Sequence, residues 1–311
     1  MAVYTTRLLN RVGAGALLIA ALACGPRRQA GVSVHPALAS LIPDDTVAVA
    51  VFRVEELKSS DVYRKWIAPR ILGRLERPAA ETGFDPRKDL FEAVVASNGK
   101  DVFVLARGRF APERIGPQLE RSGARRSVYK NFTLYGDPEA ALLFLNRAVA
   151  AAGPPGVLRS LVDRPPGNRL PARLLEKMKA VPAASQIWAV ALGPNPFGNA
   201  SVPWQGNAAG LARLLESVES VWAGADLRPG LDMTVEWTCR TKNDAKLLHD
   251  ALRGLIGMGR LSTPDNERDL LRFYDAIEVS QQEAVVRVRM SLSPELVDKF
   301  LSRMERHSPE R

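Results

Sequence analysis

The chain has 311 residues, 46% of them hydrophobic, and a formal net charge of +9. This hydrophobic content supports a sizeable core and excludes an intrinsically disordered protein. The basic residues are scattered among acidic ones without interleaved aromatic residues, so we expect no nucleic-acid partner. Because the chain has two cysteines, a disulfide-rich scaffold is also excluded.

The start of the chain has the pattern of a bacterial lipoprotein signal peptide, which we predict over residues 1–23. Arg7 and Arg11 precede an uncharged run that ends at Ala23 and is too short to span a bilayer comfortably. Small residues lead directly into Cys24, so we expect cleavage before this cysteine and lipidation of its thiol. Two alternatives stay open: an ordinary secretory signal peptide cut after Ala23, and a retained N-terminal membrane helix.

Residues 24–40 are predicted to form a polar tether, with the folded part beginning near Leu41. At about 3.5 Å per residue or less, such a tether holds the fold within some tens of Å of the membrane. Gly25 follows the cysteine, at the position where an Asp favours retention in the inner membrane of Gram-negative bacteria. The resemblance to Gram-negative lipoproteins therefore implies an outer-membrane protein that faces the periplasm.

Beyond the tether, an apolar strand followed by a short turn and an amphipathic helix recurs four times. Proline, Asp or Asn at the start of the helices supports these boundaries. The expected strands are 47–54, 101–107, 231–239 and 285–292, and the helices that follow them are 59–77, 111–122, 242–256 and 293–304. Three glycines at positions 254, 257 and 259 are interpreted as the end of the third helix. Apolar residues at helical spacing predict a further helix over 211–221.

The strands alternate apolar and polar residues, which is typical of antiparallel sheets that are packed on one face. Two hairpins support this: one over 128–135 turns at Lys130 and Asn131, and one over 274–292 turns near Gln281. We therefore expect an α+β fold with two similar lobes of antiparallel sheet and helices packed on one face, which suggests an internal duplication. The lobes are assigned to 41–165 and 166–311; whether their sheets merge stays open.

Three turn motifs carry a resemblance to known proteins. They are Leu41-Ile-Pro-Asp-Asp-Thr46, Gly83-Phe-Asp-Pro-Arg-Lys-Asp-Leu90 and Ala225-Asp-Leu-Arg-Pro-Gly-Leu231. With them, the chain resembles bacterial exported proteins and lipoproteins that are known only as domains of unknown function. The resemblance implies a duplicated α+β fold and offers no catalytic residues.

No catalytic or metal-binding motif is found in the sequence. The nucleophile elbow, the phosphate-binding loop, His-Glu-x-x-His and Cys-x-x-Cys are all missing. Cys239 alternates with apolar residues and is expected to be a buried core thiol. His249 flanks an apolar helix stripe and is expected at the core boundary. We therefore predict no catalytic residue, no metal and no cofactor.

The segment 192–207 is rich in proline and glycine and carries Phe197 and Trp204. Such long irregular loops are often functional, so these aromatics are candidate contacts for a ligand or partner; alternatively they fold back onto the core.

The leading hypothesis is a non-enzymatic envelope lipoprotein that acts by binding or scaffolding, with a membrane contact through its lipid and an envelope protein as partner. The alternatives are a carrier of a lipid or another apolar ligand and, less favoured, an enzyme without a recognisable motif.

Overall fold

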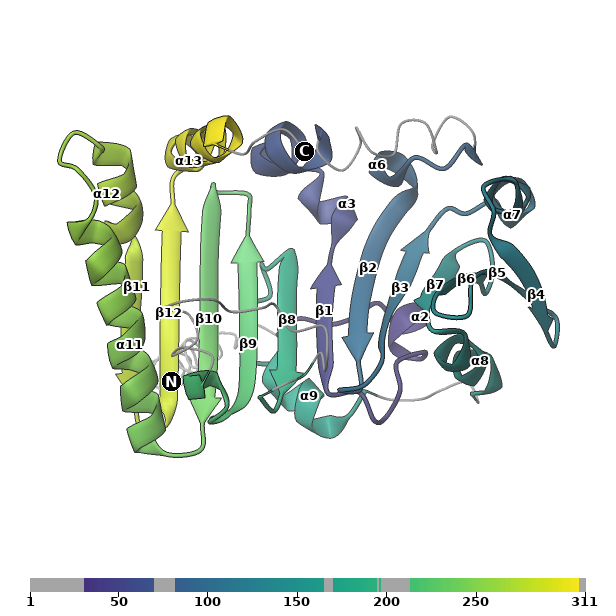
Figure 1. Cartoon of the computed structure of the whole chain (residues 1–311), viewed down its shortest axis with the longest axis horizontal. Coiled ribbons are helices and arrows are strands. Elements are labelled where there is room, and N and C mark those ends of the chain that lie inside the picture. Colours follow the sequence, from purple (N-terminus) through teal and green to yellow (C-terminus); the bar gives the residue numbers. More distant parts are fainter. Residues whose placement is uncertain (1–30, 70–81, 165–169, 195, 197–212, 308–311) are drawn as a thin grey trace, which may run out of the picture. The chain divides into compact units, whose positions relative to one another are not determined.

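A computed structural model describes residues 31–69, 82–164, 170–194, 196 and 213–307. In these ranges twelve strands form one antiparallel sheet in the order β11-β12-β10-β9-β8-β1-β2-β3-β7-β6-β5-β4 (Figure 1). The strands are β1 Ala48–Phe52, β2 Leu90–Ser97, β3 Val102–Gly108, β4 Arg125–Tyr129, β5 Phe132–Gly136, β6 Ala141–Phe144, β7 Val149–Gly153, β8 Ile187–Leu192, β9 Val218–Asp226, β10 Leu231–Cys239, β11 Ile277–Gln282 and β12 Val285–Leu292. The expected α+β fold with antiparallel sheet is thus confirmed, and the sheet is continuous.

Helices lie between and beside these strands. They are α2 Pro36–Ala39, α3 Val54–Leu57, the π-helix η1 Tyr63–Ile67, α6 Pro86–Asp89, α7 Pro112–Arg121, α8 Pro155–Asp163, α9 Ala172–Met178, α11 Lys242–Leu261, α12 Arg268–Asp275 and α13 Pro294–His307. Proline occupies the first turn of α2, α6, α7 and α8, where its fixed φ favours a helix and its missing N–H costs no hydrogen bond.

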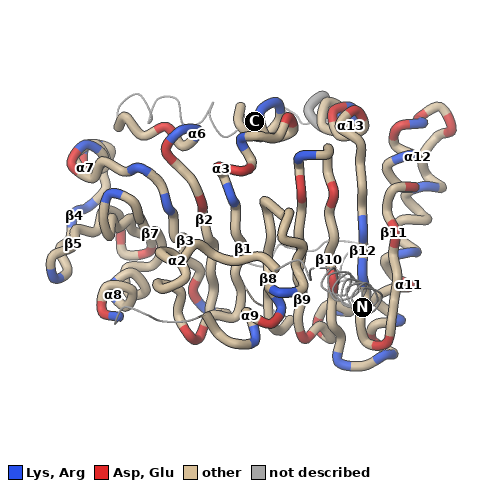
Figure 2. The backbone as a smooth tube through the Cα atoms, turned by 180° about the vertical axis from the view of Figure 1, so that it is seen from behind, with Lys and Arg blue, Asp and Glu red and all other residues tan. Residues whose placement is uncertain are grey.

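The order of elements repeats on the two sides of the β1–β8 pair, where Val49 lies opposite Val190. From this pair outward, the order β1-β2-β3-β7-β6 on one side corresponds to β8-β9-β10-β12-β11 on the other. A helix precedes β1 and β8, and another follows β3 and β10. The central strands β1 and β8 carry no charged residue (Figure 2), as expected for strands that are flanked by another strand on each edge.

The two halves also share a buried turn before their first strand. The N–H of Thr46 donates to the carbonyl oxygen of Pro43 at 3.2 Å, and that of Ser185 donates to Pro182 at 3.0 Å. Thr46 and Ser185 are each 2% exposed. Equivalent turns at equivalent places are what a duplicated chain would produce.

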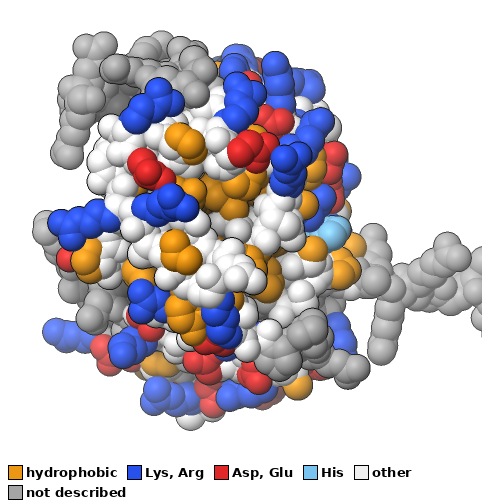
Figure 3. All heavy atoms as spheres, turned by 90° about the vertical axis from the view of Figure 1, so that its right-hand side faces the viewer, with side chains coloured by type: hydrophobic (Ala, Val, Ile, Leu, Met, Phe, Trp, Pro, Cys, Tyr) orange, Lys and Arg blue, Asp and Glu red, His pale blue; other side chains and the backbone are white. Residues whose placement is uncertain are grey.

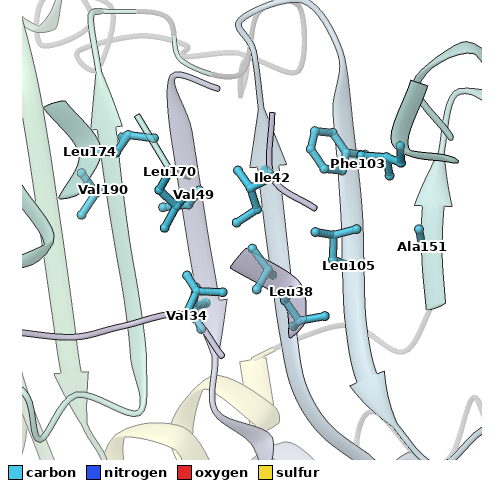
Figure 4. Close-up of a cluster of buried hydrophobic side chains, with 14 of the residues drawn as sticks. Val34, Leu38, Ile42, Val49, Phe103, Leu105, Ala151, Leu170, Leu174 and Val190 are labelled. Carbon is cyan, nitrogen blue, oxygen red and sulfur yellow. The ribbon is translucent and has the colours of Figure 1, made fainter. Parts of the chain in front are cut away.

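The largest hydrophobic cluster lies on the sheet face that carries α2, α8 and α9. Figure 4 shows side chains of this cluster from the segment before β1, from β1, β3, β7 and β8, and from α9. A separate cluster joins α11 to the opposite face through Cys239, Val286 and Leu248. Alternating strand residues supply both clusters, because successive side chains point to opposite faces. Helices are therefore found on both faces of the one sheet (Figure 1).

The fold begins before residue 41, where the tether was expected to end. Val32 and Val34 are 6% and 5% exposed, and Leu38, in α2, is fully buried. These apolar side chains, spaced by two and then by four residues, pack on the sheet. The expectation failed because a few buried contacts are enough to hold an extended segment.

The helix expected over 211–221 is wrong from Val218 onward, because this residue begins β9. Val218, Ser220 and Trp222 are buried while Glu219 and Val221 are more exposed. That alternation competes with helical spacing in a short apolar run, and pairing with β8 and β10 decides it. The glycines expected to end the helix after Lys242 do not do so either, since α11 continues to Leu261.

Candidate functional site

The segment from Gly31 to Ser40, which we call the entry segment, lies against the sheet and the end of α9. A Cβ atom at Gly31 would lie 2.3 Å from the carbonyl oxygen of Met178, closer than non-bonded atoms approach. Only glycine permits this contact between two backbones. The entry segment therefore has a defined path, and two hollows lie beside it.

The first hollow is an apolar groove of about 730 Å³ between the entry segment and α9. Its apolar lining includes Val32, Val34, Leu170, Ala172, Leu175 and Met178. Leu175 is 38% exposed, so a large aliphatic side chain of the groove faces solvent. The volume lies within the usual range for small-molecule sites, which are mostly apolar with a few polar groups.

The charges of the groove neutralise each other. Lys179 and Glu176 both line it, and the Nζ of Lys179 lies 2.8 Å from Oε2 of Glu176. This contact with Lys179 lowers the pKa of the Glu176 carboxyl. The groove thus combines an apolar floor with one paired charge at its side, a composition suited to an apolar chain and poorly suited to an ion.

The second hollow is a polar pocket of about 350 Å³ lined partly by the same segment. Its centre is Glu92 of β2, which is 6% exposed and accepts a hydrogen bond from the N–H of His35 at 3.1 Å. The Nε of Arg107 lies 3.9 Å from Oε2 of Glu92. No described residue accepts a hydrogen bond from that buried Nε. The pair is a buried electrostatic contact that joins β2, β3 and the entry segment.

Three cations surround the ring of Phe91 next to this pocket. Arg107, Arg109 and Lys58 lie 5.2, 5.4 and 5.9 Å from the ring centroid. Burial lowers the pKa of Lys58, partly offset by Glu55, and its Nζ donates to the carbonyl oxygen of Leu90 at 2.9 Å. The three cations therefore stack on one aromatic surface, and Lys58 also hydrogen-bonds to the backbone, as in a structural cluster.

The residues predicted as site residues fall mainly outside the described part of the chain. Cys24, the predicted lipidation site, and Phe197 and Trp204, the predicted contact aromatics, all lie in ranges that the structure does not describe. Their roles stay predictions. The groove was not predicted: the alternation of Val32 and Val34 could have indicated a buried segment, but not the residues of α9 that line the groove with it.

The remaining candidates have structural roles. Cys239 is 2% exposed, and burial raises the pKa of its thiol, in agreement with the predicted core position. His249 is partly exposed, with Nδ1 2.8 Å from Oδ1 of Asp250. His35 caps α2 by accepting a hydrogen bond from the N–H of Ala37. Among the described residues, no group of three His, Cys, Asp or Glu side chains could hold a metal ion.

Comparisons with known proteins found similar solved structures but no matching family. No protein-family model matches the chain, and no curated protein does either. Three crystal forms of a protein called TP0453 are similar to it. Form I is 12% identical, covers 88% of this chain and 98% of its own, and has a TM-score of 0.45; form III is 10% identical, covers 87% and 99%, and has a TM-score of 0.48. Form IV is 12% identical, covers 88% of this chain and 97% of its own, and has a TM-score of 0.47.

Within the described ranges, no helix combines the length and apolarity needed to cross a membrane.

Proposed function

We propose that this protein is a lipid-anchored, non-enzymatic binding protein of the bacterial cell envelope, attached through Cys24 to the outer membrane and facing the periplasm. The lipoprotein-type start of the sequence supports the anchor. The observation that carries the binding role is the apolar groove beside the entry segment, with Leu175 exposed in it. Scaffolding of an envelope protein is one form of this role.

The anchor would hold the binding surfaces close to the membrane. Six residues lie between Cys24 and Gly31 in the sequence, so the seven steps from one to the other span at most about 25 Å at full extension. A partner or ligand reached at that distance would itself belong to the membrane surface or its immediate surroundings.

Mass spectrometry of the native protein tests the anchor. We expect Cys24 to be the first residue of the mature chain and to carry acyl groups, with none in the Cys24→Ala variant. A mature chain that starts at Cys24 without acyl groups would leave the secretory signal peptide as the explanation. A chain that still contains residues 1–23 would establish the retained membrane helix.

A second candidate function, carriage of a lipid or another apolar ligand, is favoured by the same groove because its lining offers aliphatic side chains and one neutralised charge pair. A fluorescent fatty acid is a suitable probe. Leu175→Arg should weaken its binding by about tenfold or more, since the substitution places a charge in the apolar lining.

Leu247→Arg is the matched control, because Leu247 is 48% exposed on α11 and belongs to a different surface. Both variants should melt at nearly the temperature of the wild type. Equal binding of the probe by both variants would exclude the groove as its site and leave scaffolding as the proposed role.

A further inference from the structure

The strand β4 forms one edge of the sheet, so one side of its backbone has no partner strand in the described structure. Such an edge offers N–H and C=O groups to an added strand. The opposite edge, β11, differs because α11 runs alongside it and contacts it. The β4 edge is therefore the more accessible one.

Side chains on β4 are highly exposed. Arg125, Arg126, Ser127 and Val128 are all exposed, and Val128 is exposed by 65%, more than any other large hydrophobic residue described except Leu261. On this side of the molecule, Lys and Arg side chains surround a central group of hydrophobic ones (Figure 3). An apolar centre with a charged rim is the usual composition of an interface.

The positive charge of this edge is balanced only in part, through the electrostatic effect of Arg125 on the carboxyl of Asp137. Within the described ranges, no acidic side chain forms an ion pair with Arg125, Arg126 or Arg159. Arg159, in α8, lies over the ring of Tyr129 with its guanidinium carbon 5.6 Å from the centroid. The hydroxyl of Tyr129 donates to Asp163 at 2.7 Å, which holds this ring in position.

A pocket of about 480 Å³ lies beside the edge strand. Arg125 and Ser127, which share one face of β4, line it together with Arg159 and Asp137. The carboxylate of Asp137 accepts hydrogen bonds from the N–H groups of Ala140 and Glu139, and these lower its pKa. Two arginines therefore face one carboxylate that is already engaged, and the pocket keeps a net positive charge.

We propose that the β4 edge binds an extended, acidic segment of a partner protein, which adds to the sheet as a further strand and places a carboxylate in the pocket between Arg125 and Arg159. Backbone hydrogen bonds along β4 would supply affinity, and Arg125 and Arg159, which line the pocket, would select acidic side chains at alternate positions of the segment. The proposal rests on the binding role proposed above, but it uses a surface distinct from the apolar groove.

Charge also argues against a second copy of this chain as the occupant. Pairing β4 with β4 of another copy would bring the unpaired Arg125, Arg126 and Arg159 of both chains to one junction, with strands about 4.8 Å apart. Like charges at such separations oppose association. An acidic segment converts the same arginines into favourable contacts.

The test uses the full-length protein in mild detergent and a labelled peptide of about nine residues in which glutamate alternates with valine. Binding is measured by fluorescence anisotropy, and its location by hydrogen–deuterium exchange. We expect the peptide to slow exchange in residues 125–129. The double variant Arg125→Glu/Arg126→Glu should weaken binding by about tenfold or more.

The double variant Lys246→Glu/Arg253→Glu is the matched control, because it makes the same charge change at exposed positions of α11. It should bind the peptide within about twofold of the wild type. A peptide with lysine in place of glutamate, and one with methylated backbone nitrogens, should both fail to bind. Melting temperatures verify that all variants fold.

Equal binding by the two double variants, equal binding of the lysine peptide, or protection elsewhere than at β4 would overturn the proposal. Self-association in sedimentation that depends on β4 would overturn it in favour of a second copy. Because Leu175→Arg alters the groove alone, loss of fatty-acid binding with intact peptide binding would separate the carrier function from this one.

Discussion

The backbone N–H of His35 donates a hydrogen bond to Oε1 of Glu92 at 3.1 Å, across 57 positions of the sequence. This bond joins the entry segment to the buried side of β2. Glu92 is 6% exposed, so the contact lies in a place where an unmatched polar group is costly.

Replacing Glu92 should therefore destabilise the protein. Glu92→Ala leaves the His35 N–H without its acceptor and removes the carboxylate that lies 3.9 Å from the Arg107 Nε, at an expected cost of about 1–3 kcal/mol. Glu92→Gln keeps an acceptor for His35 and should cost less. Urea unfolding measures both, and equal effects of the two variants would show that the hydrogen bond is not what matters.

Leu38→Ala should lower the free energy of unfolding by about 2–5 kcal/mol, because it removes a fully buried side chain and leaves a cavity. Leu247→Ala, at a position 48% exposed, should change it by at most about 0.5 kcal/mol. If both variants unfold at the same urea concentration, residues up to 40 act as a tether after all.

Gly31→Val should loosen the entry segment, since its Cβ would meet the Met178 carbonyl oxygen at 2.3 Å. We expect faster hydrogen–deuterium exchange over residues 31–40 and a loss of about 1–3 kcal/mol. At Gly156 an added Cβ meets no atom within 4 Å, so Gly156→Ala is the control. Unchanged exchange in Gly31→Val would mean that the segment can shift without penalty.

Asp226 should contribute to the pH dependence of stability. Hydrogen bonds that Arg228 donates to the Asp226 carboxylate lower the pKa of this carboxyl, and the side-chain amide of Gln186 donates a further one at 2.8 Å. Because the folded-state pKa is the lower one, the contribution is fully present above the unfolded-state pKa and is lost as the pH falls through the folded-state value.

We therefore expect Asp226→Asn to cost about 1–2 kcal/mol near neutral pH and almost nothing in acid. Denaturant titrations from neutral pH to acid measure the difference in free energy of unfolding between the wild type and the variant. The exposed Asp265→Asn is the control and should show no comparable dependence; a cost of Asp226→Asn that is constant with pH would contradict the assignment.

Cys239 should react slowly in the native protein, because it is 2% exposed and burial raises the pKa of its thiol. In a Cys24→Ala background, a thiol reagent should label it only after denaturation. Labelling at the same rate in native and denatured protein would place this cysteine at the surface.

Several elements could be predicted from the sequence because their signals are local. The turn at Lys130 and the strand β12 follow from turn residues and from strict alternation. The start of α13 follows from the proline after a strand. The buried position of Cys239 follows from alternation alone. In each case, residues close in the chain determine the outcome.

Other features depended on residues far apart in the chain. Val218 belongs to β9 and not to a helix because it pairs with Cys239 of β10, in a strand that also pairs with β8. The groove exists because Val32 and Leu175, which lie far apart in the sequence, line one hollow. No spacing rule connects such positions, so the groove and the arginine pocket beside β4 could not be predicted.

The sequence by itself determined the class of fold and its repeated order of strands and helices, because periodicity and helix caps are encoded over short stretches; for the same reason it predicts a lipoprotein signal peptide. Only the tertiary structure decided that the sheet is continuous, that the entry segment packs on it, and where its hollows and free edge lie. Those features arise from pairing between distant strands and from burial of scattered side chains, which depend on the whole chain being folded.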